Sequence, residues 1–114
     1  MWIVDAEQWP RACLRAELIE RGFDAVGWFA LDESLAALRR PAIERPAVVV
    51  LELRGQPIDE ERLAALESTS IPVVLIGGAI ELAEPALGRL SCARVLPRPV
   101  TLGAVADAVE ELLR

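Results

Sequence analysis

The residues best suited to chemistry in this sequence are acids that directly follow short apolar runs. Trp2–Val4 leads into Asp5, with Glu7 close behind, and the apolar run Ala47–Leu51 leads into Glu52. A short apolar run between Pro and Gly predicts a strand buried on both faces, as in parallel sheets covered by helices. An acid at its end lies at the carboxyl edge of the sheet, where such folds place their sites.

Several kinds of catalysis lack their usual residues. The chain has no histidine, which removes the commonest general base and the commonest zinc ligand. Its two cysteines, Cys13 and Cys92, fit no metal-binding spacing and are interpreted as small core or surface thiols. We therefore expect no catalytic residue, no bound metal and no cofactor, and we do not expect an enzyme.

Composition narrows the remaining function classes. The 114 residues are 54% hydrophobic, 26% charged and carry a net charge of −6, which favours one globular domain over residues 1–114. All of the basic residues are arginines and they form no basic stripe, so direct nucleic-acid binding is not expected. No apolar stretch is long enough to span a membrane, and the first residues do not have the pattern of a secretion signal. We therefore expect a cytoplasmic protein without membrane contact.

Apolar runs and helical patterns alternate along the whole sequence. The expected strands are Trp2–Asp5, Phe23–Ala30, Ala47–Leu51, Ile71–Ile76 and Ala93–Leu96. The expected helices are Arg11–Arg21, Glu33–Arg40, Glu60–Ser68, Ile80–Leu90 and Leu102–Leu113. Strands that alternate with helices predict right-handed crossovers and a parallel sheet. The predicted fold class is α/β, a flavodoxin-like doubly wound five-stranded parallel sheet in the order 2-1-3-4-5 with helices on both faces.

Local signals predict how the helices begin and end. Pro10 suits the first turn of its helix, and Gly22 suits the position just past the helix end. Asp32 and Asp59 are expected to cap the helices that follow them. The helix over Ile80–Leu90 is expected to be weak, because it contains Pro85 and Gly88.

Three segments make the chain resemble the receiver domains of bacterial response regulators. The spacing from Asp5 through Gly22 is that of a receiver, Pro72–Gly77 resembles the fourth receiver strand, and Val95–Pro99 resembles the turn where the family has Lys-Pro. The resemblance covers essentially the whole chain. It implies a CheY-like module of two-component signalling, in which two acids hold Mg²⁺ and an aspartate ending the third strand accepts a phosphoryl group. A Thr or Ser and a lysine then bind the phosphate.

The positions that would carry this chemistry depart from the family pattern. Asp5 matches the first acid, but the second acid position is Ala6, with Glu7 one residue further. Glu52 stands at the phospho-acceptor position, Gly77 at the hydroxyl position and Arg98 at the lysine position. The resemblance therefore implies a pseudo-receiver, in which the fold is kept and phosphorylation is lost.

The remaining charged residues allow a structural interpretation of this degenerate pocket. We expect Glu52 and Arg98 to form a permanent ion pair near Asp5, because Arg suits a bidentate grip on a carboxylate. A metal at Asp5, Glu7 and Glu52 is disfavoured, since Mg²⁺ requires several well-placed oxygen ligands. The Arg98–Pro99 bond is expected to be cis, as the Lys-Pro bond is in receivers.

The expected partner is a protein. In receivers, the face built from helix four, strand five and helix five makes dimers and output contacts. Apolar residues crowd the same region here, namely Leu82, Leu87, Leu90, Val95, Ala106 and Val109. We therefore expect a protein-interaction or homodimerisation module. The alternatives are an atypical phospho-accepting receiver that uses Asp5, Glu7 and Glu52, and a domain that binds a small ligand over Gly77 and Gly78.

Overall fold

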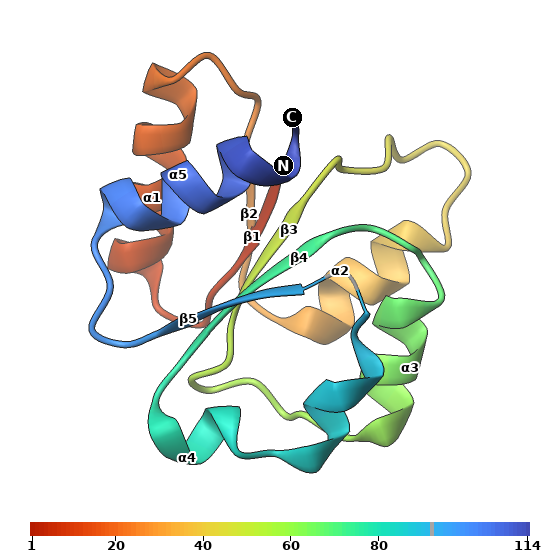
Figure 1. Ribbon diagram of the computed structural model, residues 1–114. Coiled ribbons are helices and arrows are strands. Elements are labelled where there is room, and N and C mark those ends of the chain that lie inside the picture. The colour runs from red at the N-terminus through yellow and green to blue at the C-terminus, as the bar shows by residue number, and fades with distance from the viewer. Residues whose placement is uncertain (92) are drawn as a thin grey trace.

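The computed structural model, which describes residues 1–91 and 93–114, contains one five-stranded parallel sheet. The strand order is β2-β1-β3-β4-β5, as predicted, and the sheet runs through the centre of the molecule (Figure 1). The strands are β1 (Trp2–Val4), β2 (Val26–Trp28), β3 (Val49–Glu52), β4 (Val73–Gly77) and β5 (Ala93–Pro97). The strand predicted over Phe23–Ala30 is therefore shorter than expected.

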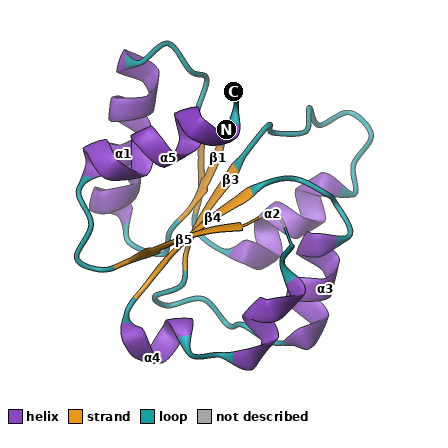
Figure 2. Cartoon of the chain, viewed as in Figure 1, coloured by secondary structure: helices purple, strands orange, loops and turns teal. Residues whose placement is uncertain are grey.

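Helices cover both faces of this sheet (Figure 2). They are α1 (Gln8–Glu20), α2 (Leu31–Leu38), α3 (Glu60–Glu67), α4 (Ala79–Leu82), the 3₁₀ helix η1 (Pro85–Arg89) and α5 (Leu102–Leu112). Helices α1 and α5 pack on one face, and α2, α3 and η1 on the other. The predicted α/β architecture is confirmed.

The apolar runs become the two central strands of the sheet. Every residue of β3 and β4 is buried, and alternate side chains enter opposite cores. Val49 and Leu51 pack toward α2 and α3, whereas Val48 and Val50 pack toward α1 and α5. Burial on both faces explains why these strands are continuous apolar runs rather than alternating patterns.

Two helix ends follow the sequence signals. Gly22 lies just past α1 with a φ of 92°, a left-handed conformation that favours glycine, as predicted. The side chain of Asp59 caps α3 by accepting a hydrogen bond of 2.8 Å from the backbone N–H of Arg62.

The expected cap of α2 is wrong. This helix begins at Leu31, so Asp32 lies inside its first turn and pairs with Arg62 across the surface. The free N–H of Leu31 instead donates to Oε1 of the buried Gln56 at 2.9 Å. The Gln56 Nε2 group in turn donates to the carbonyl of Phe29 at 3.0 Å. A side chain from the loop after β3 therefore satisfies the amino end of α2.

The fourth helical segment is broken, as its proline suggested. Helix α4 is one turn long, and η1 begins at Pro85. A continuous helix over Ile80–Leu90 is therefore not formed, because Pro85 cannot donate the hydrogen bond that a helix interior requires. Cys13 is a half-buried free thiol, and Cys92 lies outside the described residues. Of the helices in the described part of the chain, none has the length and apolar character needed to cross a membrane.

Candidate functional site

The candidate site lies at the carboxyl edge of the sheet, where the predicted residues come together. Glu52 ends β3, Gly77 ends β4, and Asp5 directly follows β1. Asp5 and Glu52 are only 6% and 5% exposed, which is unusual for carboxylates and requires charged or hydrogen-bonding partners. Arg98 directly follows β5 and donates its backbone N–H to the carbonyl of Gly77 at 2.9 Å. That bond fixes Arg98 over the ends of β3 and β4.

Arg98 bridges two carboxylates. Its Nη1 group donates to Oε1 of Glu52, and its Nη2 group donates to Oε1 of Glu81, which lies on α4. The expected Glu52–Arg98 ion pair is therefore present. The part played by Glu81 was not predicted from the sequence, although its position soon after the Gly77–Gly78 break could have suggested it. The bridge ties the end of β3 to α4 through the guanidinium group.

Asp5 is held by a second group of contacts. Its Oδ1 atom accepts a 2.9 Å hydrogen bond from the backbone N–H of Glu7 and lies 3.9 Å from Nη2 of Arg54. The Glu7 carboxylate is exposed and pairs with Nε of Arg54 at 2.9 Å. Arg11 donates to the backbone carbonyl of Asp5 at 2.7 Å. Glu7 therefore pairs with Arg54, a residue to which the sequence analysis gave no role.

The electrostatics of the two buried carboxyls are dominated by desolvation. Burial raises the pKa of Glu52 above its usual value, and the charge of Arg98 opposes that rise only in part. Burial likewise raises the pKa of Asp5, opposed by the hydrogen bond from Glu7 and by the charge of Arg54. The site therefore holds negative charge at a free-energy cost that its arginines do not fully offset.

The space beside Gly77 is already occupied. A Cβ atom at this position would lie 3.0 Å from Cδ1 of Leu53 and 3.4 Å from atoms of Glu81 and Leu82. Leu53 itself is 4% exposed and belongs to the core on the α2–α3 side. A hydroxyl-bearing side chain at position 77 would therefore require Leu53 to move.

The glycine pair does not offer a free anion site. The backbone N–H of Gly78 donates to Oε1 of Glu81 at 2.7 Å, so a carboxylate of the protein takes this donor. The neighbouring pocket of about 290 Å³ is lined by Glu81 and Glu84, which repel anions. Helix α4 is also too short to supply a strong dipole.

A second pocket opens between the amino ends of α1 and α5. It has a volume of about 260 Å³ and reaches from Asp5 and Glu52 past Arg98 and Pro99 to Leu102. The Arg98–Pro99 peptide bond is cis, as predicted. Among the described residues, no group of three or more acidic, histidine or cysteine side chains is arranged to hold a metal ion. Ala6 adds no ligand, because its methyl side chain carries no oxygen, nitrogen or sulfur atom.

The apolar face predicted for protein contacts is divided between core and surface. Leu90, Ala106 and Val109 are buried and belong to the two cores. Leu82 and Leu87 are half-buried against the core on the α2–α3 side. Val95 on β5 is 51% exposed, and Ile80 at the start of α4 is 91% exposed. Fewer apolar side chains are therefore exposed on this face than the six residues named from the sequence would suggest.

The comparisons with known proteins place the fold. No protein-family model matches the chain, and no curated protein matches it. Among solved structures, the receiver domain of the Francisella response regulator 1452 is similar, with a TM-score of 0.78 and 18% identity over 97% of this chain and 93% of that chain. A response regulator receiver protein from Pseudomonas putida gives a TM-score of 0.78 and 24% identity over 96% and 93%.

Two further structures extend this likeness. A CheY-like receiver domain protein from Methanospirillum hungatei JF-1 has a TM-score of 0.80 at 16% identity, covering 98% of this chain and 90% of that chain. NtrX from Brucella abortus is 26% identical with a TM-score of 0.76, but this chain covers only 26% of the NtrX chain. The chain therefore has the receiver-domain fold.

Proposed function

We propose that this receiver-fold chain is a phosphorylation-independent interaction module of bacterial signal transduction. The observation that carries the proposal is the bridge from Arg98 to Glu52 and Glu81. In a working receiver, a lysine at this position awaits a phosphoryl group. Here a guanidinium group already has two carboxylate partners inside the protein. The module works as a binding partner whose pocket stays in one state.

The chemistry of Glu52 supports the same proposal. Glutamate is one methylene longer than aspartate, which displaces its carboxylate oxygens by about 1.3–1.5 Å, and phosphoryl transfer tolerates little displacement from its near-attack geometry. Oε1 of Glu52 also already accepts a hydrogen bond from Nη1 of Arg98. A Mg²⁺ ion bound by Asp5 would lack the second acidic ligand, since Ala6 stands at that position and its side chain has no oxygen.

Exposure to a small phosphodonor tests this proposal. The protein is incubated with acetyl phosphate and Mg²⁺, and its intact mass is measured beside that of the Glu52→Gln variant. We expect no mass gain in either protein. A gain of one phosphoryl group that requires Glu52 would overturn the proposal and establish the alternative of an atypical receiver that uses Asp5, Glu7 and Glu52.

The face built from α4, β5 and α5 is the proposed contact surface, for a protein partner or a second copy of the chain. Ile80 and Val95 supply its exposed apolar groups, and Arg94 and Glu111 form an ion pair of 2.5 Å across β5 and α5. Sedimentation velocity over a wide concentration range distinguishes the two partners. A dimer that Val95→Glu dissociates would identify a second copy, whereas a monomer at all concentrations would exclude a second copy as the partner.

A further inference from the structure

The groove between α2 and α3 has apolar walls and lies far from the pocket at the carboxyl edge. Its pocket of about 210 Å³ is lined by Leu35 and Leu38 of α2, by Ala65 at the end of α3, and by Ser68 and Thr69. A second hollow of about 160 Å³ shares Leu35, Arg39 and Ala65 with the first and continues the groove along the helices. The structure uses neither hollow for the site described above.

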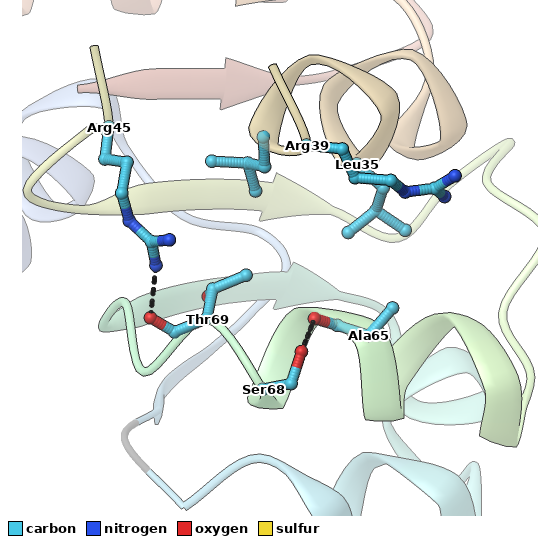
Figure 3. A pocket seen from close by; sticks show the side chains of 7 residues that line it. Leu35, Arg39, Arg45, Ala65, Ser68 and Thr69 are labelled. Carbon is cyan, nitrogen blue, oxygen red and sulfur yellow. Dashed lines mark hydrogen bonds between the residues drawn. The ribbon is translucent and has the colours of Figure 1, made fainter. Parts of the chain in front are cut away.

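Arginines extend from two sides of this groove. Figure 3 places Arg45 at one end, where it donates to the carbonyl of Thr69, and Arg39 at the other end beside Leu35. Ser68 is turned toward its own helix, because its hydroxyl donates to the carbonyl of Ala65 at 2.7 Å. The groove therefore presents guanidinium groups around an aliphatic bed, with the Ser68 hydroxyl already satisfied.

Several arginines near this groove are not paired with a carboxylate. Six arginines of this acidic chain have carboxylate partners, namely Arg21, Arg54, Arg62, Arg89, Arg94 and Arg98. Among the described residues, Arg39, Arg40 and Arg45 have no such ion pair, and the same holds for Arg11, Arg15 and Arg114 elsewhere on the molecule. The dipole of α2 accounts for positive charge at Arg39 and Arg40, but not at Arg45, which lies beyond the helix.

Of the described acids, none forms an ion pair with Arg39 or Arg45. Asp32 is held by Arg62, which together with the more distant Arg39 lowers the pKa of Asp32. Glu61 lines the far hollow beside Arg62. Glu44 lines a neighbouring pocket together with Met1 and Arg45, and its charge acts on the terminal ammonium group. Arg45 at one end and Arg39 at the other are therefore both without an ion pair among the described residues.

We propose that this groove binds an acidic, leucine-containing peptide segment of a partner protein. An aliphatic side chain fills the bed formed by Leu35, Leu38 and Ala65, and flanking carboxylates meet Arg39 and Arg45. Neither hollow reaches the roughly 300 Å³ at which enclosed small-molecule pockets begin, so a segment that lies along the groove fits better than a buried ligand.

A defined peptide pair tests this site independently of the phosphorylation test. The probe is a fluorescein-labelled peptide of Glu-Leu-Leu-Glu flanked by glycines, and its control replaces both glutamates with glutamine. Amide chemical shifts of the labelled protein map where each peptide binds. We expect the acidic peptide to shift the resonances of residues 35–45 and 65–69, and to bind about tenfold more tightly than the glutamine peptide.

Three variants separate this site from general charge attraction. Arg39→Glu replaces a cation of the groove with an anion, and Ala65→Leu fills the aliphatic bed without changing the charge. Arg114→Glu makes the same charge reversal at a distant arginine that has no ion pair. We expect the first two to weaken the acidic peptide about tenfold and the third to leave it unchanged, with native amide dispersion in all three. No binding at millimolar peptide, or binding that Ala65→Leu does not weaken, would overturn the proposal.

Discussion

Glu52 is a buried carboxylate whose neighbours determine what the pocket can do. Its position at the end of an apolar run was predictable, because such a run must become a buried strand and the residue after it must reach the sheet edge. The pairing with Arg98 was also predictable from the resemblance. The participation of Glu81 was not, because a helical pattern does not show which of several acids will reach across to the sheet.

Removing the guanidinium group of Arg98 should lower the stability of the fold, because Glu52 would then be buried without a cation. Arg98→Met leaves Glu52 buried without its cation, and we expect a loss of about 2 kcal/mol in the free energy of unfolding, measured with urea. The value is below the roughly 3–5 kcal/mol of a fully buried pair, because the Arg98 side chain is 27% exposed. The double variant Glu52→Gln/Arg98→Met should recover most of that loss; no recovery would show that the pair is not the source of the effect.

The buried Asp5 predicts an unusual pH dependence. Because burial raises the pKa of Asp5 in the folded protein above its usual value, ionisation of this carboxyl group opposes folding. This free-energy cost is absent at a pH below the pKa of Asp5 in the unfolded protein. It grows as the pH rises toward the raised pKa in the folded protein and is fully present above it. Asp5→Asn, which keeps an oxygen for the N–H of Glu7, should therefore raise the melting temperature at neutral pH but not at pH 3. Equal melting temperatures of the two proteins at neutral pH would contradict this account.

At the scale of the elements, strands were easier to predict than helix ends. The runs in β3 and β4 are apolar because both faces are covered, and this signal needs no tertiary information. The start of α2 depends on Gln56, whose amide arrives from another loop, so no local pattern near Asp32 contains it. Helix α4 and η1 separate at Pro85 for a local reason, which the sequence did show.

The Gln56 side chain should be worth a measurable part of the stability. Gln56→Ala removes two hydrogen bonds between the loop after β3 and the start of α2, leaving the N–H of Leu31 and the carbonyl of Phe29 without partners. We expect a loss of about 1–3 kcal/mol in the free energy of unfolding. Pro57→Ala, at the exposed neighbouring position, is the matched control. If both variants unfold at the same urea concentration, Gln56 does not anchor α2.

Restoring a hydroxyl at the end of β4 should be destabilising. Gly77→Thr places a Cβ atom 3.0 Å from Cδ1 of Leu53, and such overpacking costs about 1–3 kcal/mol. In a Leu53→Ala background, the added cost of Gly77→Thr should shrink, because the obstructing methyl group is gone. A thermodynamic cycle of the four proteins in urea measures this coupling; additive effects would show that Leu53 does not occupy the space.

At the scale of the whole molecule, the fold and the site follow different constraints. The receiver fold needs buried strands and two helical layers, and these are shared with structures at 16–24% identity. The pocket needs particular side chains, and Glu52, Gly77 and Arg98 differ from those that phosphoryl transfer uses. The fold was therefore predictable from patterns along the chain. The α2–α3 groove was not, because it depends on how two helices and the loop with Arg45 pack together.

The central claim is that the pocket is already filled by its own charges, and one titration tests it most directly. Mg²⁺ and beryllofluoride are added to isotopically labelled protein while amide chemical shifts are recorded. The account predicts no saturable shifts at Asp5, Glu52, Gly77 or Arg98, because Arg98 already bridges Glu52 and Glu81. Saturable shifts at these residues that spread into α4 would contradict it and make the domain a phosphoryl switch.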